Sequence, residues 1–378
     1  MNVREFDFDL PPELIAQEPP PHRAAARLLH LDRQSGNIQH TTVAALPDLL
    51  QPGALVVVNN TRVFPARLLG RRVPTGGAVE CLLVRREGTE VAGGDAGVRG
   101  GRRSPAGTEV WEALMHPGQK LRPGARVVFP PQRGCRAGDP GEGMRTLHGE
   151  VLERRFYGRR TIRLWTADGS SVNEAIDAIG HVPLPPYIKR DDRQDDRDRY
   201  QTVFARHRGS VAAPTAGLHF TTALVDALRV RGVQMAEITL HVGYGTFQPV
   251  RVEHVEDHRI DAEQFEIGAA AAEAVNAALA ENRRIVAVGT TTTRTLEAVA
   301  VAHDRRIAAG AGFTDLFIYP GHEFTVVGGL LTNFHLPRSS LLMLVAAFAG
   351  RERVLNAYRA AIADRYRFYS YGDAMLIT

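Results

Sequence analysis

Outside its middle third, the chain alternates short apolar runs with longer amphipathic ones. Apolar runs of strand length occur at 54–58, 238–242 and 285–288, and each leads into a turn rich in Gly, Thr, Asn or His. This alternation predicts a mixed α/β domain, in which ligands bind beyond the carboxyl ends of the strands. The amphipathic runs predict helices at 222–231, 269–281, 293–303, 339–349 and 352–366.

The middle of the chain has a different pattern. Short β-type runs occur at 79–84, 109–114, 126–129 and 160–165, separated by Gly and Pro turns without a helical period. This pattern predicts a small antiparallel β-barrel. We therefore expect a discontinuous α/β catalytic domain, 1–67 plus 167–378, with a β-barrel domain inserted at 68–166.

Three further segments are predicted to be loops. Two of them, 93–107 and 134–143, are rich in Gly, Ala and Arg and interrupt the predicted barrel. The third, 189–199, alternates the sign of its charges and predicts a solvated loop.

The basic residues are almost all arginine, since only Lys120 and Lys189 among the 46 basic residues are lysines. The chain has no P-loop motif, and a lysine Schiff base has only these two candidates. Arginine suits phosphate and RNA contacts because its guanidinium binds phosphate bidentately, although a GC-rich coding bias gives the same composition.

The sequence also restricts where the protein works. The longest apolar stretch, 341–349, is shorter than the roughly 20 residues that span a membrane, and the N-terminus lacks the apolar region of a signal peptide. Cys81 and Cys135 are too far apart in sequence to indicate a disulfide framework or a zinc cluster. We expect a cytoplasmic protein without a membrane anchor.

Three histidines are candidates for acid–base chemistry. His219 lies in the loop before a predicted helix, His241 lies in a predicted strand end, and His335 lies in the segment 331–337. Imidazole exchanges protons near neutral pH, so each can act as a general acid or base. Each can equally be structural, but all three occur where strand ends are predicted.

Two glycine-containing turns are candidate ligand sites. Gly289 precedes four threonines and a predicted helix that carries Arg294, an arrangement that suits an anionic or polar ligand and also an ordinary helix N-cap. The pair Gly243 and Gly245 lacks the third glycine of a dinucleotide fingerprint, because Gln248 occupies that position. A Rossmann dinucleotide site is therefore not expected.

Two other motifs are ambiguous. His254 and His258 could bind a metal if helical, but the segment lacks an H-E-x-x-H motif and an exposed polar turn is favoured, so no metal site is expected. The aromatic and arginine-rich tail 366–373 is typical of a base-stacking surface or of a half-buried strand.

Ten segments taken in order resemble one family, the S-adenosylmethionine:tRNA ribosyltransferase-isomerases of the queuosine pathway. They are 6–11, 59–67, 180–188, 200–203, 212–220, 239–250, 289–297, 318–321, 332–337 and 366–376. The chain departs from the family at 260–263, where Ile-Asp-Ala-Glu replaces a Met-His-Ser-Glu-like stretch. The role of that histidine is therefore not transferred.

The resemblance implies a mixed α/β domain interrupted by a β-barrel. It also implies transfer of the ribosyl moiety of S-adenosylmethionine to 7-aminomethyl-7-deazaguanine at the tRNA wobble position. The product would be epoxyqueuosine, with release of adenine and methionine. S-adenosylmethionine would be consumed as co-substrate, with no metal or other cofactor, and we expect a monomer. The competing interpretations are a non-catalytic tRNA-binding protein and an RNA methyltransferase.

The implied chemistry ranks the candidate residues. A base that removes a ribose C5′ proton is expected among His219, His241 and His335, in that order. Arg294, or Arg62 and Arg67, are candidates for the methionyl carboxylate. The other expected substrate-binding positions lie in the matching segments: Asn59, Thr61, Thr215, Gly217, Gly243, Gly245, Thr246, Thr290, Thr291, Asn333 and Asp373. Of these, Asn333 and Asp373 are candidates for the ammonium or ribose.

Overall fold

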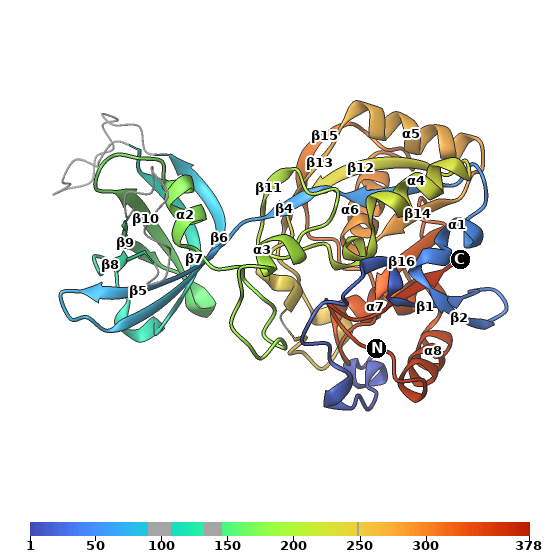
Figure 1. The fold of residues 1–378 in the computed structure, drawn as a ribbon, viewed down its shortest axis with the longest axis horizontal. Coiled ribbons are helices and arrows are strands. Elements are labelled where there is room, and N and C mark those ends of the chain that lie inside the picture. The colour runs from blue at the N-terminus through green and yellow to red at the C-terminus, as the bar shows by residue number, and fades with distance from the viewer. Residues whose placement is uncertain (90–106, 132–145, 248) are drawn as a thin grey trace. The chain divides into compact units, whose positions relative to one another are not determined.

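The computed structural model describes residues 1–89, 107–131, 146–247 and 249–378. They form two compact units, one made of Met1–Val63 with Leu184–Thr378 and the other of Phe64–Pro183. The segment expected as an insert, 68–166, lies inside the second unit (Figure 1). That unit also includes helix α2, Val172–Ile179, because α2 buries Val172, Ala175 and Ile176 and contacts the barrel strands.

The larger unit is built on a mixed sheet. In the part of the chain that the structure describes, nine strands lie in the order β15-β13-β12-β3-β14-β16-β17-β1-β2. The central four strands, β12, β3, β14 and β16, are parallel. Toward the edges, β13 runs antiparallel to β12, β15 to β13, β17 to β16 and β2 to β1. The bounds are β1 Arg27–Leu31, β2 Ile38–Thr42, β3 Leu55–Asn59, β12 Gln234–Leu240, β13 Glu263–Ile267, β14 Ile285–Val288, β15 Gly310–Thr314, β16 Gly329–Asn333 and β17 Ala374–Ile377.

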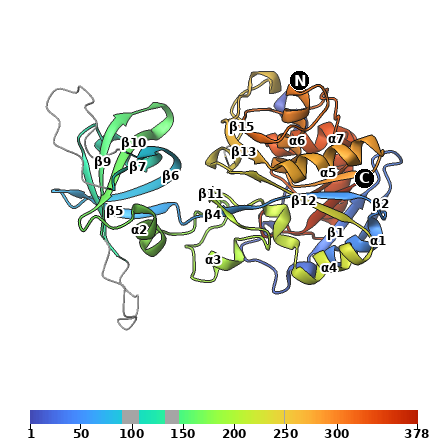
Figure 2. The ribbon, with the colours of Figure 1, turned by 90° about the horizontal axis from the view of Figure 1, so that it is seen from above.

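Helices cover both faces of this sheet (Figures 1 and 2). Successive side chains of β3 enter opposite cores, with Leu55 and Val57 in one and Val56 and Val58 in the other. A strand buried on both faces reads as a continuous apolar run, which explains the sequence pattern. One core holds α5 Ala269–Ala280, α6 Thr290–Ala302, α7 Ser340–Ala349 and α8 Arg351–Ala363; the other holds α1 Leu46–Leu49 and α4 Thr222–Val230.

The predicted helices are present, and their ends agree to within one residue except at two places. Helix α6 begins at Thr290 rather than 293, because Gly289 adopts φ 90° and ψ 154° and starts the helix immediately after it. Helix α8 ends at Ala363 rather than 366, because Arg365 has a left-handed backbone with φ 54°.

The smaller unit contains a closed antiparallel barrel, which confirms the predicted β module. Its described strands lie in the order β10-β7-β6-β5-β8-β9. The sequence pattern did not indicate β5 and β9, because each has a central glycine against which neighbours pack: Phe129 at Gly70, and Val127 with Ile162 at Gly149. The bounds are β5 Arg67–Val73, β6 Ala78–Thr89, β7 Glu109–His116, β8 Arg126–Phe129, β9 Leu147–Arg154 and β10 Arg159–Thr166.

The two predicted barrel loops cannot be compared with the structure. Residues 93–106 of the first and all of 134–143 lie outside the described residues. Elsewhere, the short strands β4 Thr61–Val63 and β11 His207–Ser210 form a two-stranded parallel sheet in the larger unit.

The prediction of a solvated loop at 189–199 is wrong for part of this segment. Asp196, which begins the short helix α3 (Asp196–Arg199), is only 3% exposed. Both its carboxylate oxygens accept from Arg190, at 2.7 and 2.9 Å, and Oδ1 also accepts from the Tyr371 hydroxyl at 2.9 Å. The alternating charges did not reveal the burial of Asp196, because Tyr371, which contacts it, is distant in the sequence.

Both interpretations of the tail 366–373 also need correction. Tyr366 and Phe368 are fully buried and Tyr371 is 2% exposed, so these rings cannot stack on a base at the surface. The segment is irregular, and strand β17 begins only after it. The rings instead pack into the core, as Tyr366 and Phe368 do against Phe334.

The described residues contain neither a candidate membrane span nor a candidate metal cluster. None of their helices is long and apolar enough to cross a membrane. No group of three or more His, Cys, Asp or Glu among them could hold a metal ion, and the segment with His254 and His258 contains only a short 3-10 helix, Val255–Asp257.

Candidate functional site at the carboxyl ends of the parallel strands

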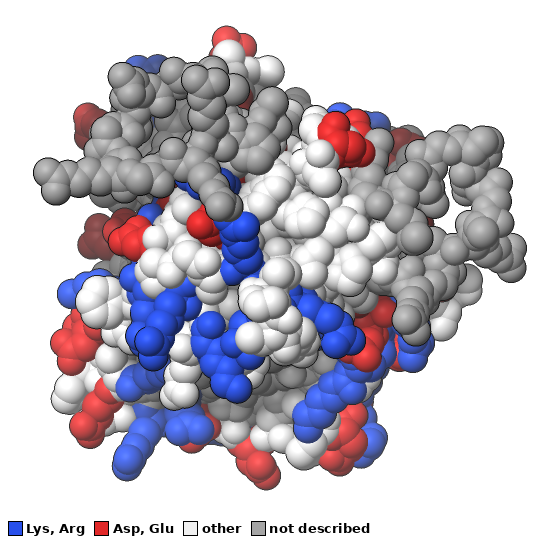
Figure 3. All heavy atoms as spheres, turned by 90° about the vertical axis from the view of Figure 1, so that its left-hand side faces the viewer, with Lys and Arg blue, Asp and Glu red and all other residues white. Residues whose placement is uncertain are grey.

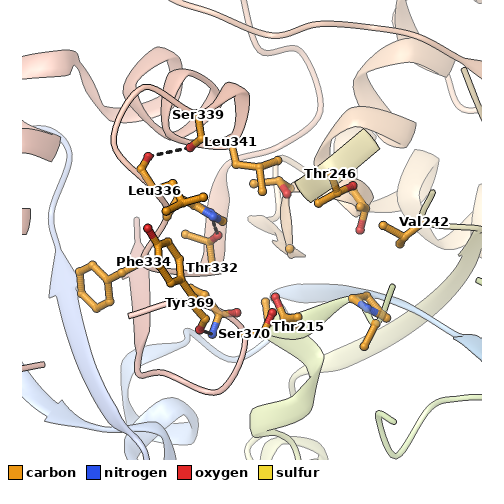
Figure 4. Close-up of a pocket in the computed structure, with 18 of the residues that line it drawn as sticks. Thr215, Val242, Thr246, Thr332, Phe334, Leu336, Ser339, Leu341, Tyr369 and Ser370 are labelled. Atoms are coloured by element: carbon orange, nitrogen blue, oxygen red, sulfur yellow. Dashed lines mark hydrogen bonds between the residues drawn. The ribbon is translucent and has the colours of Figure 1, made fainter. Parts of the chain in front are cut away.

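A pocket opens at the carboxyl ends of the parallel strands of the larger unit (Figure 4). Gly289 follows β14, Asn333 ends β16 and Val242 lies just beyond β12. The space amounts to about 660 Å³, counted out to its open mouth. The lining residues are Tyr187, Ala213, Pro214, Thr215, Ala216, Val242, Thr246, Gly289, Thr290, Thr291, Thr332, Asn333, Phe334, His335, Leu336, Ser339, Leu341, Tyr369 and Ser370.

The strand connections explain why a pocket forms here. After β3 the chain passes through the smaller unit and then through α4, on one face of the sheet, before it returns in β12. It leaves the adjacent strand β14 through α6, on the other face, and returns in β16. Adjacent strands whose connections leave to opposite faces open a crevice between them, which is where open α/β sheets bind ligands.

The N-terminus of α6 forms one wall of the pocket. Gly289 supplies a backbone conformation that is essentially restricted to glycine and brings Thr290 and Thr291 to the lining. The Thr292 and Thr293 hydroxyls donate to the carbonyls of Val288 and Gly289, at 2.8 and 3.1 Å. The first amides of a helix have no intrahelical acceptor, so this wall suits a polar or anionic group.

Three buried polar atoms around the pocket lack partners among the described residues. They are Thr291 Oγ1, Asn333 Oδ1 and the Tyr369 hydroxyl. Their residues are 6%, 2% and 4% exposed, whereas the amide nitrogen of Asn333 is used and donates to the Tyr369 carbonyl at 3.1 Å. An unsatisfied buried polar atom costs about 1–3 kcal/mol, so the pocket is built for a ligand that supplies hydrogen bonds.

His335 is the one candidate histidine that lines this pocket. Its Nε2 lies 2.7 Å from Thr332 Oγ1, and its backbone N–H donates to the Tyr358 hydroxyl at 3.0 Å. Burial lowers the pKa of His335 to about 3. The imidazole is therefore neutral at neutral pH and carries a lone pair that can accept a proton.

His219 lies on the other side of Asn333. Its Nε2 accepts from Asn333 Nδ2 at 3.2 Å, and it lines a separate recess with Arg23, Arg199 and Tyr371. Burial, with a smaller contribution from the positive charges of Arg367 and Arg23, lowers the pKa of His219 to about 4. Asn333 thus connects this histidine with the pocket.

His241 lies outside the pocket and is held by other contacts. Its Nδ1 lies 2.8 Å from Thr61 Oγ1, and its ring fills the space at Gly209, where a Cβ would lie 2.6 Å from Cε1. Burial lowers the pKa of His241 as well. It does not line the pocket.

Arg294 belongs to a second recess that adjoins the pocket and shares Thr246 and Leu341 with it. Its Nη1 lies 2.6 Å from Glu263 Oε2, in a pair whose side chains are 7% and 6% exposed. Its Nε donates to the Leu316 carbonyl at 3.0 Å.

The structure brings together only part of the predicted site. Thr215, Thr246, Thr290, Thr291, Asn333 and His335 line the pocket, and Gly245 and Arg294 line the adjoining recess. The remaining candidates lie elsewhere in the described structure, and several have evident structural partners.

Asn59 and Asp373 have polar partners within the fold. Asn59 Oδ1 accepts from the backbone of Thr61 and Leu240, and its Nδ2 donates to the Leu240 carbonyl, which links β3 to β12. The two carboxylate oxygens of Asp373 accept from the backbone amides of Arg27 and Arg367.

The remaining arginine and glycine candidates are distributed over both units. Arg62 is exposed on β4, and Arg67 lies in the smaller unit, 2.7 Å from Glu80. Gly217 leaves room for Thr202, and the Gly243 amide donates to Glu263.

Sequence reasoning missed several lining residues. Tyr187, Thr332, Tyr369 and Ser370 lie inside the segments quoted for the resemblance, so their membership in those motifs was the available signal. The side chains at the start of α7 had no such signal. Leu341 reaches the pocket because β16 leads into α7 beside it, a proximity that only the fold establishes (Figure 4).

Comparisons with known proteins agree with this architecture. The queuosine biosynthesis protein family profile matches residues 3–377. Proteins named S-adenosylmethionine:tRNA ribosyltransferase-isomerase from Geobacter sulfurreducens and Desulfitobacterium hafniense are 48% and 45% identical, over all of this chain and all of each relative. The crystal structure of S-adenosylmethionine tRNA ribosyltransferase from Thermotoga maritima is 36% identical, with a TM-score of 0.52, covering 99% of this chain and 100% of that one. These full-length matches show that the chain belongs to the queuosine biosynthesis protein family.

Proposed function

We propose that this protein is an S-adenosylmethionine:tRNA ribosyltransferase-isomerase. It transfers the ribosyl moiety of S-adenosylmethionine to the aminomethyl group of 7-aminomethyl-7-deazaguanine in tRNA, and releases adenine and methionine. The observation that carries this proposal is identity of 44–48% along the whole chain with relatives that bear this name. The match leaves no domain of this chain without a counterpart in those relatives.

The pocket fits the chemistry of this reaction. The sulfonium of S-adenosylmethionine acidifies the C5′ protons of the ribose, so a base can remove one and form an ylide. The carbanion pair forms a C4′=C5′ bond as C4′–O4′ breaks, and O4′ becomes the C1′ aldehyde as adenine leaves with a proton. The substrate amine adds to C4′ of this vinyl sulfonium, the regenerated ylide carbon C5′ bonds to C1′, and the resulting C1′ alkoxide displaces methionine from C5′ to give the epoxide. The protein has to supply an acceptor for one proton and hydrogen bonds for the ribose and the adenine.

His335 is the candidate base that the geometry favours. It lines the pocket, whereas His219 and His241 do not. Thr291 Oγ1 and Asn333 Oδ1, which have no partner among the described residues, are available to the ribose hydroxyls and the adenine. His219, expected first from sequence, contacts Asn333 and does not itself line the pocket.

The proposal includes the other reactant and the site of action. S-adenosylmethionine is a co-substrate, and the reaction needs no additional cofactor. The polyanionic partner is tRNA with 7-aminomethyl-7-deazaguanine at the wobble position, bound in the cytoplasm by a monomer. Exposed arginines of the chain, such as Arg62 and Arg71, provide phosphate contacts.

Product analysis by mass spectrometry tests the proposal. The protein is mixed with S-adenosylmethionine and tRNA that carries 7-aminomethyl-7-deazaguanine, with unmodified tRNA as the control. Adenine and methionine should appear only with the modified tRNA, together with an epoxycyclopentanediol adduct on the base. Binding of tRNA without products would support the non-catalytic alternative, and S-adenosylhomocysteine would indicate methyl transfer; either result would refute the proposal.

A further inference from the structure

The recess beside the pocket has its own polar chemistry. It amounts to about 420 Å³ including its mouth, and it is lined by Arg294, Glu263, Asp261 and Gly245 together with apolar side chains of α7. It adjoins the pocket through Thr246. A ligand in the pocket can therefore extend into the recess.

The guanidinium of Arg294 is incompletely paired. Nε donates to the Leu316 carbonyl and Nη1 to Glu263, but buried Nη2 has no partner among the described residues. The side chain is only 7% exposed, so water satisfies this nitrogen poorly. A buried charged donor without an acceptor is costly, and a carboxylate is the acceptor that forms the strongest bonds to arginine.

Glu263 does not accept from Nη2 in this structure. Its Oε2 is already used by Nη1, and its Oε1 accepts from the Gly243 amide at 2.9 Å. These contacts fix the guanidinium in one orientation and neutralise its charge locally. The Nη2 side is thus a rigid donor for a second, incoming carboxylate.

The recess also contains a negative group for a cation. The Asp261 carboxylate lies over Gly245, where a Cβ would be 3.1 Å from Oδ2, and it lines the same recess as Arg294. A donor for a carboxylate and a carboxylate for an ammonium, in one recess, match the two charges of an α-amino acid.

Helix α6 connects the two cavities. Thr290 lines the pocket and Arg294 lines the recess, and four residues along a helix put both on the same face, about 6 Å apart along its axis. A molecule with a nucleoside at one end and an amino acid at the other fits this spacing.

We propose that the recess binds the amino-acid end of the substrate, with Arg294 Nη2 holding its α-carboxylate and Asp261 facing its α-ammonium. This assignment rests on the proposed function, which identifies the substrate as S-adenosylmethionine. Arg294 is a substrate-binding residue here, and Glu263 is its positioning residue.

Calorimetric binding of two ligands tests the assignment. The probes are S-adenosylmethionine and decarboxylated S-adenosylmethionine, which differ at the group that Arg294 would hold. The wild-type protein should bind the carboxylated probe about 10- to 100-fold more tightly, as expected for a charge-assisted hydrogen bond. In Arg294→Gln this ratio should fall to near one.

The ratio of the two affinities distinguishes a substrate-binding role of Arg294 from a structural one. If Arg294 had only a structural role, its substitution would weaken the binding of both probes equally and leave the ratio of their affinities unchanged. Because Arg294→Gln leaves Glu263 buried without its cation, the double variant Arg294→Gln/Glu263→Gln provides a second measurement with neither charge. Arg306→Gln removes an exposed arginine beyond the end of α6 and should keep the wild-type ratio.

The outcomes distinguish the two proposals. Equal affinity of the wild-type protein for both probes, absence of binding of either, or a wild-type ratio in both Arg294 variants would refute the recess assignment. A ratio that collapses in the variants while no adenine is released with modified tRNA would support the recess and refute the proposed reaction. Adenine release together with a wild-type ratio in the variants would support the proposed reaction and refute the recess assignment.

Discussion

At the scale of single residues, several buried polar atoms without partners gather at the site, although others, such as Arg72 Nε in the barrel unit, lie elsewhere. Thr291, Asn333, Tyr369 and Arg294 each keep one buried polar atom without a partner among the described residues, and all four line the pocket or its adjoining recess. Candidate residues with a complete set of partners, such as Asn59, hold the fold instead. Residue type alone does not separate these two groups, because both contain threonines, asparagines and arginines.

Replacement of His335 by asparagine tests the proposed base. The variant keeps a polar side chain but loses the proton acceptor, so kcat for adenine release should fall about 10²- to 10⁴-fold. The affinity for S-adenosylmethionine, measured by calorimetry, should change less than tenfold. Burial holds the pKa of His335 at about 3, so protonation of this ring should not reduce wild-type activity between pH 5 and 7.

A matched control is His303→Asn, which changes an exposed histidine after α6 and should retain wild-type kcat. If His335→Asn keeps full kcat while His219→Asn loses it, the order expected from the sequence is correct and the geometric assignment is wrong.

Helix α6 is the element on which both cavities depend. Its first residues form a wall of the pocket, and its second turn carries Arg294 into the recess. The start of the helix depends on Gly289, whose φ of 90° and ψ of 154° lie in a region that other residues avoid. A Cβ at this glycine would meet only ordinary contacts, at 3.7 Å, so the requirement is one of backbone conformation.

Gly289→Ala should therefore lower the free energy of unfolding by about 1–3 kcal/mol and weaken S-adenosylmethionine binding. Urea denaturation and calorimetry measure the two effects. Gly268→Ala is the control, because Gly268 precedes α5 with φ −71° and open space around it. Alanine at position 268 lowers the conformational entropy of the unfolded chain but is a poorer N-cap than glycine, so the two effects on the free energy of unfolding should nearly cancel. Equal effects of the two substitutions would contradict this account of Gly289.

At the scale of the whole molecule, the chain combines an α/β unit that contains the pocket with a barrel unit that carries many basic residues. Lys and Arg side chains gather over the lower half of the face in Figure 3. The exposed basic residues of the barrel unit include Arg71, Lys120, Arg122 and Arg126. Polyanion binding by such a surface is driven by counterion release and weakens with salt.

Affinity for tRNA should accordingly fall steeply between 50 and 200 mM salt, by about 10³-fold or more if at least six phosphates are bound. S-adenosylmethionine affinity should change little over the same range. Filter binding and calorimetry give the two slopes. The variant Lys120→Gln/Arg122→Gln/Arg126→Gln should have a smaller tRNA slope, by about 1 for each phosphate that its side chains no longer neutralise. Equal slopes for both ligands would remove the case for phosphate binding.

The sequence by itself determined the fold class, the strands with continuous apolar runs, most helices and the family. These features are local or repeated along the chain: β3 is apolar because both faces are buried, and the matching motifs are contiguous segments. Tertiary structure decided which motif residues face a ligand. Gly289 is far in sequence from Asn333 and Leu341 and lies beside them only because strands β14 and β16 are neighbours. It also decided that Asp196 and Tyr366 are buried, since burial depends on side chains contributed by distant segments.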